Sequence, residues 1–582
     1  MLRLYMKVAD TLRARALADG RLAIEPGTAV NADDLMQTAR DHDLRFKRVH
    51  SVSDADLNSL ERRAAVRTGM AQPDAAGLVE VVPKGAASRA QMIGLARVLH
   101  ALAAVEFAEL ESLDAPSPPP ASDIAPPTPL LSGGQSYRSA GSGIDVDYVW
   151  NALGVRGHPS VRLTDCEYSF NATHEDLAGL TQIQPGVVSM YTAFGDDHGA
   201  AVQGMLGAGV NGYGMTGCAP ACAAWFFPEF STLASGSQNR AACVTAAIAA
   251  SAPGDVVLLE MQATGAQGGY GPAEYSPSVF NAVKLGADAG VIIIGAAGNG
   301  AENLDDAAYA AYRSRGDSGA IIVGAGTAAR APLSFSTHGL RVNLQGWGEG
   351  VSTTGYGTLA IYGGDANQKY ASDFGGTSSA AALVSAAAVL LQSVAVEICE
   401  TRLSPAEMRA LLVSSGRAQT GDVTRNIGPL PDLRAAVAAL VGAHPPPFST
   451  LRSWALFHFG TPSPPPDADP DGDGAPNLVE YVLGTDPRSD AGGEMAASAP
   501  RLTAASSDGT PLLVFEFHHP PSRAGAAWSV QQSPDLTPGS WLDVVPGTGG
   551  ATMNQEGGVC RVTLPRSPGA ARGFVRLHVT AP

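Results

Sequence analysis

The stretch Phe374-Gly-Gly-Thr-Ser-Ser-Ala-Ala-Ala-Leu-Val-Ser-Ala-Ala-Ala-Val-Leu-Leu391 is an apolar run of helical character that opens on a glycine pair, Thr377 and Ser378. A hydroxyl at the N-terminus of a helix lies beside free backbone N–H groups and the positive end of the helix dipole, and both stabilise an oxyanion. Gly-Thr-Ser is also an ordinary helix N-cap. The stretch predicts a buried helix and makes Ser378 a candidate nucleophile.

Three further polar residues stand at the ends of strand-like runs or at the start of small-residue helices, in the chain order Asp165, His198 and Asn299. Serine attack on a carbonyl needs a base within hydrogen-bond reach, a carboxylate that fixes the tautomer of this base, and donors directed at the developing negative charge. Together with Ser378, these residues fill each role. The sequence therefore predicts a serine hydrolase site assembled from four distant segments.

The order Asp, His, Asn, Ser and the surrounding motifs resemble those of the subtilisin-like serine proteases, the subtilases, over roughly residues 141 to 440. The resemblance implies that Ser378 is the nucleophile, His198 the general base and then acid, and Asp165 the carboxylate that orients His198. Asn299 is then a side-chain donor to the oxyanion, beside the backbone N–H of Ser378. The resemblance also implies that the substrates are proteins or peptides.

The chain departs from the usual pattern of this family at several positions. The run His198-Gly-Ala-Ala-Val-Gln-Gly204 lacks the second His and the Thr, Asp165 is followed by Cys166 and Glu167, and Ala382 replaces a proline. Glu167 leaves an alternative open, because it either shares the charge near His198 or points away on the opposite face of the strand, and we expect the second from strand alternation. In the related sedolisins a Glu is the base, but His198 argues against that mechanism.

Within residues 141–443, the strand-like runs VVSMYTAF, VVLLEM, VIIIGA and AIIVGAG alternate with helical segments that begin near His198, Gln238, Tyr275 and Ser378. This alternation predicts an α/β fold with a doubly wound parallel sheet and helices on both faces, which is subtilisin-like by resemblance. Ligands bind such sheets at the carboxyl ends of the strands, where we expect Asp165 and Asn299.

Residues 1–112 have the pattern of a separate α+β domain, and a Pro-rich linker follows at 113–140. Subtilases are typically made with such a domain, which assists folding, blocks the cleft with its C-terminal tail and is cut off by the enzyme itself. By resemblance, this segment is a propeptide and an intramolecular inhibitor. An unrelated domain that stays attached is the alternative. Exposed linkers are favoured sites of cleavage, so we expect the cut between about Leu113 and Ser142.

Residues 444–497 contain a second linker and the acidic stretch PDADPDGDGAPNLVEYVLGTDP. Carboxylate oxygens at alternate positions of this stretch can coordinate one cation, and Gly474 permits the sharp turn that a calcium loop requires. The segment resembles the calcium repeats of thrombospondin type 3 and dockerin-like modules, although Pro476 argues against a paired EF-hand. The predicted Ca²⁺ ligands are Asp469, Asp471, Asp473, the carbonyl of Ala475, Asn477 and Glu480.

The last segment, residues 498–582, alternates short strand-like runs with Gly, Pro and Ser turns and predicts a small β-sandwich. The formal net charge of −17 disfavours nucleic acid and anionic membranes as partners. We expect no membrane span, because the apolar run at Ala380–Leu391 is short. The six cysteines do not fix a pairing.

We therefore expect a secreted, calcium-dependent serine endopeptidase that is made as a zymogen. The N-terminus as written has no continuous apolar segment typical of a secretory signal, so export uses another route or an upstream start. The alternative is a catalytically inactive, calcium-dependent binding or adhesion protein on a subtilase scaffold. The retained Asp165, His198, Asn299 and Ser378 favour the enzyme.

Overall fold

The structure is a computed structural model that describes residues 2–25, 30–85, 87, 89–112, 127–177, 179–190, 196–233, 236–489, 498–520, 523–524, 526–566 and 573–580. The chain divides into two compact units. The first comprises Met1–Val149, Arg156–Val394 and Arg402–Leu440, and the second comprises Trp150–Val155, Ala395–Thr401 and Val441–Pro582. The first half of the predicted linker, residues 113–126, lies outside the described residues, and so do residues 191–194 of the predicted strand VVSMYTAF.

A parallel sheet forms the centre of the first unit, and the predicted α/β fold class is confirmed. Three of its inner strands are rich in Val, Ile and Leu and are buried along their whole length, as in sheets covered on both faces. The order of the seven strands is β18 (Leu344–Trp347), β17 (Ile321–Gly326), β16 (Ile292–Ala296), β13 (Val256–Leu259), β7 (Arg162–Glu167), β10 (Ala223–Pro228) and β8 (Thr181–Ile183).

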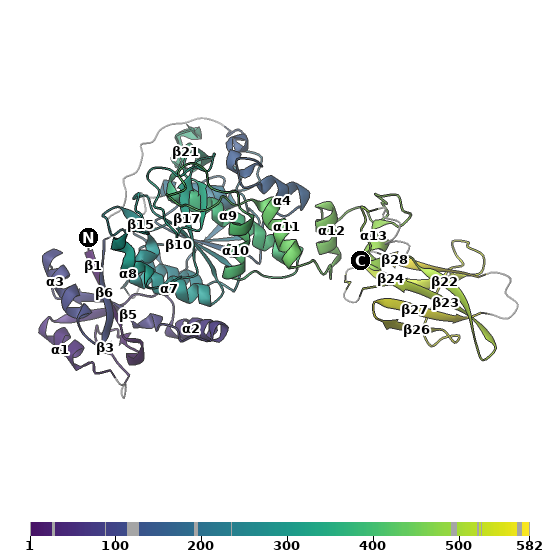
Figure 1. Ribbon diagram of the computed structural model, residues 1–582, viewed down its shortest axis with the longest axis horizontal. Coiled ribbons are helices and arrows are strands. Elements are labelled where there is room, and N and C mark those ends of the chain that lie inside the picture. Colours follow the sequence, from purple (N-terminus) through teal and green to yellow (C-terminus); the bar gives the residue numbers. More distant parts are fainter. Residues whose placement is uncertain are drawn as a thin grey trace. The chain divides into compact units, whose positions relative to one another are not determined.

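Helices cover both faces of this sheet (Figure 1). On one face, α6 (Arg240–Ala249) and α7 (Pro277–Asp288) share a core with Val257 and Ile293. On the other face lie α5 (Asp196–Gly207) and α9 (Gly376–Glu397), and the backbone of α9 is so close to Gly346 of β18 that a side chain there would clash with Ala380. Helix α9 is long and apolar enough to cross a membrane, but 94% of its apolar window is buried inside the protein, as in a core helix.

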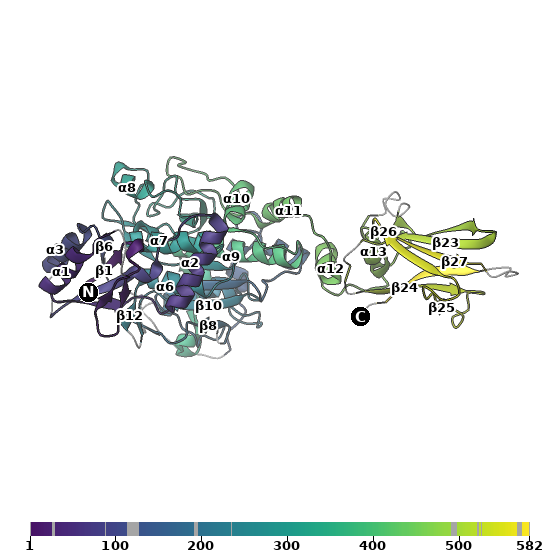
Figure 2. The same cartoon turned by 90° about the horizontal axis from the view of Figure 1, so that it is seen from below.

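The N-terminal segment forms a four-stranded antiparallel sheet in the order β4 (Leu44–Arg48), β5 (Leu78–Pro83), β1 (Leu2–Val8) and β6 (Val105–Ser112). Helices α1 (Asp33–Asp41) and α3 (Arg89–His100) lie beside it (Figures 1 and 2). Side chains alternate along β1: Leu4 and Met6 enter the core of this segment, and Tyr5 enters the core that contains α6 and α7. Both faces of β1 are therefore buried.

Helix α2 (Asp54–Thr68) of the N-terminal segment packs directly on α7 and α6. Its Leu60 and Ala64 belong to the same apolar core as Val244 and Val283 of these two helices. The N-terminal segment and the parallel sheet therefore form one continuous structure in the first unit.

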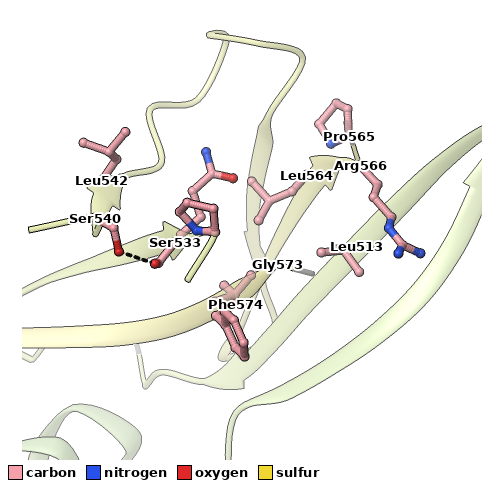
Figure 3. A pocket seen from close by; sticks show the side chains of 12 residues that line it. Leu513, Ser533, Ser540, Leu542, Leu564, Pro565, Arg566, Gly573 and Phe574 are labelled. Atoms are coloured by element: carbon pink, nitrogen blue, oxygen red, sulfur yellow. Dashed lines mark hydrogen bonds between the residues drawn. The ribbon is translucent and has the colours of Figure 1, made fainter. Parts of the chain in front are cut away.

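The second unit contains α12 (Leu451–Phe459), α13 (Asn477–Leu483) and two antiparallel sheets that share a core around Phe515, Phe517 and Val530. One sheet contains, in order, β22 (Arg501–Ser507), β23 (Thr510–His518), β27 (Val559–Pro565) and β26 (Thr552–Glu556). The other sheet contains β25 (Leu542–Asp543), β24 (Ala527–Ser533) and β28 (Phe574–Thr580). This is the arrangement of a β-sandwich. A hollow of about 780 Å³ lies where strands of the two sheets meet, with Leu513, Leu564 and Phe574 in its lining (Figure 3).

All six cysteines are free thiols. Five of them are buried, and Cys222 is partly buried. Burial raises the pKa of the Cys222 thiol to about 12, so this thiol is protonated at neutral pH. The described part of the chain therefore has no disulfide framework.

Candidate functional site

Ser378 and His198 lie together although 180 positions separate them. Ser378 is the third residue of α9, and His198 is the third residue of α5. The Ser378 hydroxyl donates a hydrogen bond to Nε2 of His198 over 3.1 Å. This contact is the one a serine nucleophile and its general base require.

The carboxylate at the other nitrogen of His198 belongs to Glu167. Nδ1 of His198 donates a hydrogen bond to Oε2 of Glu167, and Oε1 of Glu167 accepts from the backbone N–H of Tyr168 at 2.5 Å. Glu167 is fully buried. From the sequence, this position was assigned to Asp165 and Glu167 was expected to point away from His198, and the geometry corrects both assignments.

Strand geometry explains the correction. Asp165 and Glu167 are two residues apart in β7, and residues separated by two positions point to the same face of a sheet. Glu167 ends the strand and meets the first turn of α5, which carries His198. Asp165 lies two residues before Glu167 in β7 and contacts Gln203, which lies five residues after His198 in α5. Nε2 of Gln203 donates a hydrogen bond to Oδ2 of Asp165 at 2.8 Å.

The surroundings of Asp165 favour its neutral, protonated form. Burial and then the nearby charge of Glu167 raise its pKa well above the usual value, and the hydrogen bond from Gln203 opposes them only in part. Its Oδ1 atom has no hydrogen-bond partner among the described residues. A protonated carboxyl cannot stabilise an imidazolium, so Asp165 is not suited to the role that was predicted for it.

The surroundings of His198 hold its ring in place and favour its charged form. Burial opposes protonation, but the charge of Glu167 and its hydrogen bond outweigh this effect, and the pKa of His198 is raised above its usual value. The rings of Tyr168 and Phe374 lie edge-on to the imidazole, with centroids at 6.0 and 5.6 Å. The imidazole is therefore oriented by Glu167 and enclosed by aromatic walls.

Asn299 lies beside the start of α9, just beyond the end of β16. Its Oδ1 accepts hydrogen bonds from the backbone N–H of Thr377 at 2.8 Å and from the hydroxyl of Thr377 at 3.1 Å. The carbonyl oxygen is thereby occupied, which leaves the Nδ2 group as the donor that faces outward. Gly376 is at φ +90°, and a Cβ there would lie 3.3 Å from Nδ2 of Asn299. The glycine keeps this donor unobstructed.

The N-terminal segment reaches the edge of this site through the end of β6. Oε2 of Glu109 accepts a hydrogen bond from the Ser276 hydroxyl at 2.8 Å, and Glu111 lies 3.7 Å from Arg240. A cavity of about 490 Å³ at this junction is also lined by Tyr168, which neighbours Glu167, and by the strand β14 (Gln262–Thr264). Gln262, the first residue of β14, borders this cavity.

The acidic loop of the second unit brings most of its predicted ligands together. Carboxylate oxygens of Asp469, Asp471 and Asp473 lie within 4.8 Å of one another, and Gly474 adopts φ +94°, as a sharp turn requires. Glu480 of α13 is fully buried, and burial followed by the charges of these three aspartates raises its pKa to about 7. The N–H of Ala475 donates to Oδ1 of Asp473 at 2.9 Å.

The oxygens of this loop fit a hard cation. Among the described residues, Oδ2 of Asp471, Oε2 of Glu480 and Oδ1 of Asn477 are buried and have no hydrogen-bond partner. Buried carboxylate and amide oxygens without partners cost stability unless a cation or a proton compensates them. Oxygen donors in this number and charge are those that Ca²⁺ prefers.

Part of the chain is similar to known proteins. Residues 184–429 match the model of the Subtilase family. Similar solved structures include proteases from Pseudoalteromonas arctica PAMC 21717, with 18% identity over 54% of this chain and 99% of that chain and a TM-score of 0.39. They also include a mutant of the protease domain of PatA, with 21% identity over 50% of this chain and 98% of that chain and a TM-score of 0.39.

A cold-adapted subtilisin-like serine proteinase is also similar, with 20% identity over 48% of this chain and 90% of that chain and a TM-score of 0.36. The search of curated proteins returned no match. The region that matches the family model contains His198, Asn299 and Ser378, whereas Asp165 and Glu167 precede it. The part of the chain that is similar to the Subtilase family is therefore residues 184–429.

Proposed function

We propose that this protein hydrolyses internal peptide bonds of proteins with Ser378 as nucleophile, His198 as general base and Glu167 as the carboxylate that orients His198. The hydrogen-bonded chain Ser378–His198–Glu167 carries the proposal. The oxygen of Ser378 attacks the carbonyl carbon while its proton passes to Nε2 of His198. The same proton then goes to the leaving amine, and a water molecule activated by His198 releases the acyl group.

The oxyanion of the tetrahedral intermediate has two suitable donors. One is the backbone N–H of Ser378, which belongs to the first turn of α9 and has no earlier carbonyl in the helix to bind. The other is Nδ2 of Asn299, whose amide is held in orientation by Thr377. Donors fixed before the reaction stabilise charge without any cost of reorganisation during it.

Labelling with a biotinylated fluorophosphonate tests this function directly. We expect the reagent to attach covalently to Ser378, because only an activated hydroxyl displaces fluoride at neutral pH, and we expect the same preparation to hydrolyse casein. Mass spectrometry of the labelled peptide identifies the site. A catalytically inactive binding protein on the same scaffold would remain unlabelled and would leave casein intact.

We also propose that residues 1–112 are a propeptide that inhibits the enzyme from within the same chain. The two-sided burial of β1 and the packing of α2 on α6 and α7 support this proposal, because they hold the segment against the helices that cover the parallel sheet. The end of β6 also lines the cavity beside Tyr168 and Gln262, through Glu109 and Glu111.

Self-cleavage predicts a characteristic time course for the full-length protein. We expect a lag in peptide hydrolysis that ends as the N-terminal segment is removed, with a new N-terminus between residues 113 and 142. N-terminal sequencing at intervals and a parallel activity assay measure both events. Full activity of a protein that still has all 582 residues would contradict the inhibitory role.

We propose a structural Ca²⁺ ion in the loop at Asp469–Glu480, in keeping with a secreted enzyme, because extracellular calcium is abundant enough to fill such loops. The side chains of Asp469, Asp471, Asp473, Asn477 and Glu480 and the carbonyl of Ala475 would hold the ion. The bound ion would compensate the buried oxygens of Asp471 and Glu480 and so fix the start of α13.

Removal of calcium should destabilise the second unit. At a free Ca²⁺ concentration 100 times Kd, binding contributes about 2.7 kcal/mol, so chelation with EGTA should lower its Tm by about 5–10 °C. Differential scanning calorimetry with and without EGTA measures this shift. The variant Glu480→Gln should show the lower Tm in both conditions, whereas Asp508→Asn, at an exposed turn outside the loop, should respond to EGTA as the wild type does.

A further inference from the structure

Glu260 is a buried carboxyl inside the site that the chemistry above does not use. It follows β13 directly, is 3% exposed, and its backbone N–H donates to the carbonyl of Cys166 over 3.1 Å. In the parallel pair of β13 and β7, Leu258 stands opposite Asp165 and Leu259 opposite Cys166. The next position places Glu260 level with Glu167, on the same face of the sheet.

The carboxyl of Glu260 lies close to both Glu167 and His198. One of its oxygens, one oxygen of Glu167 and one ring nitrogen of His198 lie within 4.8 Å of one another. The Ser378 hydroxyl is close enough to favour the ionised form of Glu260 through a polar contact. Even so, neither oxygen of Glu260 has a hydrogen bond of normal geometry with any described residue.

A buried carboxylate without a cationic partner is costly, so the neutral acid is favoured at this position. Burial, followed by the charges of Glu167 and Asp165, raises the pKa of Glu260 well above its usual value, and the contact with Ser378 opposes this only in part. The groups that face Glu260 are Glu167 and Asp165 from β7, His198 from α5, Ser378 from α9, and Tyr356 beyond β19 (Val351–Thr354).

We propose that Glu260 is a positioning residue that orients the Ser378 hydroxyl as a neutral carboxylic acid, an inference that rests on the proposed peptidase function. The acid O–H donates toward Oγ of Ser378, which directs the proton of Ser378 to Nε2 of His198. During attack, the O–H bond of Ser378 breaks, its proton moves to His198, and Oγ bonds to the carbonyl carbon. Glu260 keeps its own proton throughout.

Ionisation of Glu260 reverses this effect. The carboxylate can only accept a hydrogen bond, so it competes with His198 for the proton of Ser378. It also places a second negative charge next to Glu167, and this charge favours the imidazolium form of His198, which cannot act as a base. Activity should therefore decline as alkaline pH removes the proton of Glu260.

The pH dependence of kcat/KM between pH 5 and 10 tests this inference in the wild type, Glu260→Gln and Glu260→Ala. Glutamine cannot ionise but still donates a hydrogen bond through its amide, so Glu260→Gln should show no alkaline decline and a kcat at pH 7 only about threefold below the wild-type value. Alanine cannot donate, so Glu260→Ala should lower kcat about tenfold. KM should be unchanged in both variants. Asp165→Asn is the matched control, because it replaces another buried acid of the cluster with a side chain that cannot ionise, and this variant should keep the alkaline decline.

Two results would overturn the role of Glu260: an alkaline decline in Glu260→Gln that equals that of the wild type, or a kcat of Glu260→Ala equal to the wild-type value. Circular dichroism at each pH separates loss of activity from unfolding. Failure of the proposed function itself has a different signature, because the wild type would then neither hydrolyse the peptide nor react with the fluorophosphonate at any pH.

Discussion

Ser378→Ala is expected to lower kcat for peptide hydrolysis by about 10⁶-fold, the size measured when the nucleophile of a serine protease is removed. The methyl group cannot form the acyl-enzyme, so only substrate binding and the oxyanion donors remain. The fold should persist, because the third residue of α9 uses its side chain for the contact with His198 and not for the apolar core. Steady-state hydrolysis of a fluorogenic peptide measures the loss.

Ser385→Ala is the matched control for this substitution. Ser385 belongs to the same helix and is fully buried, and its hydroxyl has no hydrogen-bond partner among the described residues. This variant should keep wild-type kcat. The Ser378→Ala protein should also retain its N-terminal segment indefinitely, whereas the wild type and Ser385→Ala should lose it. Equal hydrolysis by Ser378→Ala and the wild type would remove the proposed mechanism.

Glu167→Gln should cost about 10⁴-fold in kcat, the effect of replacing the triad carboxylate by its amide in another serine protease. The amide cannot stabilise the imidazolium, and it can turn its NH₂ group toward Nδ1, which then carries no proton. That tautomer places the proton on Nε2, where the base should accept one from Ser378. Single-turnover kinetics with a peptide ester isolates this step.

The pH profile gives a second measure of the same substitution. His198 must be neutral to act as a base, and the charge of Glu167 is the main influence that raises its pKa. Without this charge the pKa of His198 falls, so the acidic limb of kcat/KM should move to lower pH in Glu167→Gln. A limb at unchanged pH would show that another group controls the protonation of His198.

Asp165→Asn separates the two carboxyls of β7. The asparagine oxygen can still accept the hydrogen bond from Gln203, and Asp165 is held neutral by its surroundings, so we expect kcat within about threefold of the wild type. The acidic limb should also stay in place. A loss of about 10⁴-fold in Asp165→Asn together with an active Glu167→Gln would return the orienting role to Asp165.

Local patterns in the sequence were sufficient for most of the secondary structure in the first unit. The α+β pattern predicted for residues 1–112 appears in the structure as helices such as α1 and α2 and strands such as β5 and β6. The periodicity of apolar residues determines such elements locally. The short hairpin of β11 (Ser231–Leu233) and β12 (Gly236–Gln238) was not predicted, because it consists of small polar residues without that periodicity.

The identity of the nucleophile and the base was also visible in the sequence, since Ser378 and His198 each begin a helix of small residues. The carboxylate was not. Asp165 and Glu167 share one face of β7, so the position of α5 along the strand decides which of the two carboxyls contacts His198. No local sequence pattern indicates that position. The same holds for Glu260, whose proximity to Glu167 results from the register between β13 and β7.

The sequence by itself determined the α/β class, the N-terminal and C-terminal segments, the calcium-type spacing of the acidic loop and two members of the catalytic cluster, because each depends on neighbouring residues. Only the tertiary structure decided which carboxylate binds His198, which one accepts a hydrogen bond from Gln203, and which one lies buried near Ser378. Helix displacement and strand register set these contacts, and both are fixed by packing between segments that are distant in the chain.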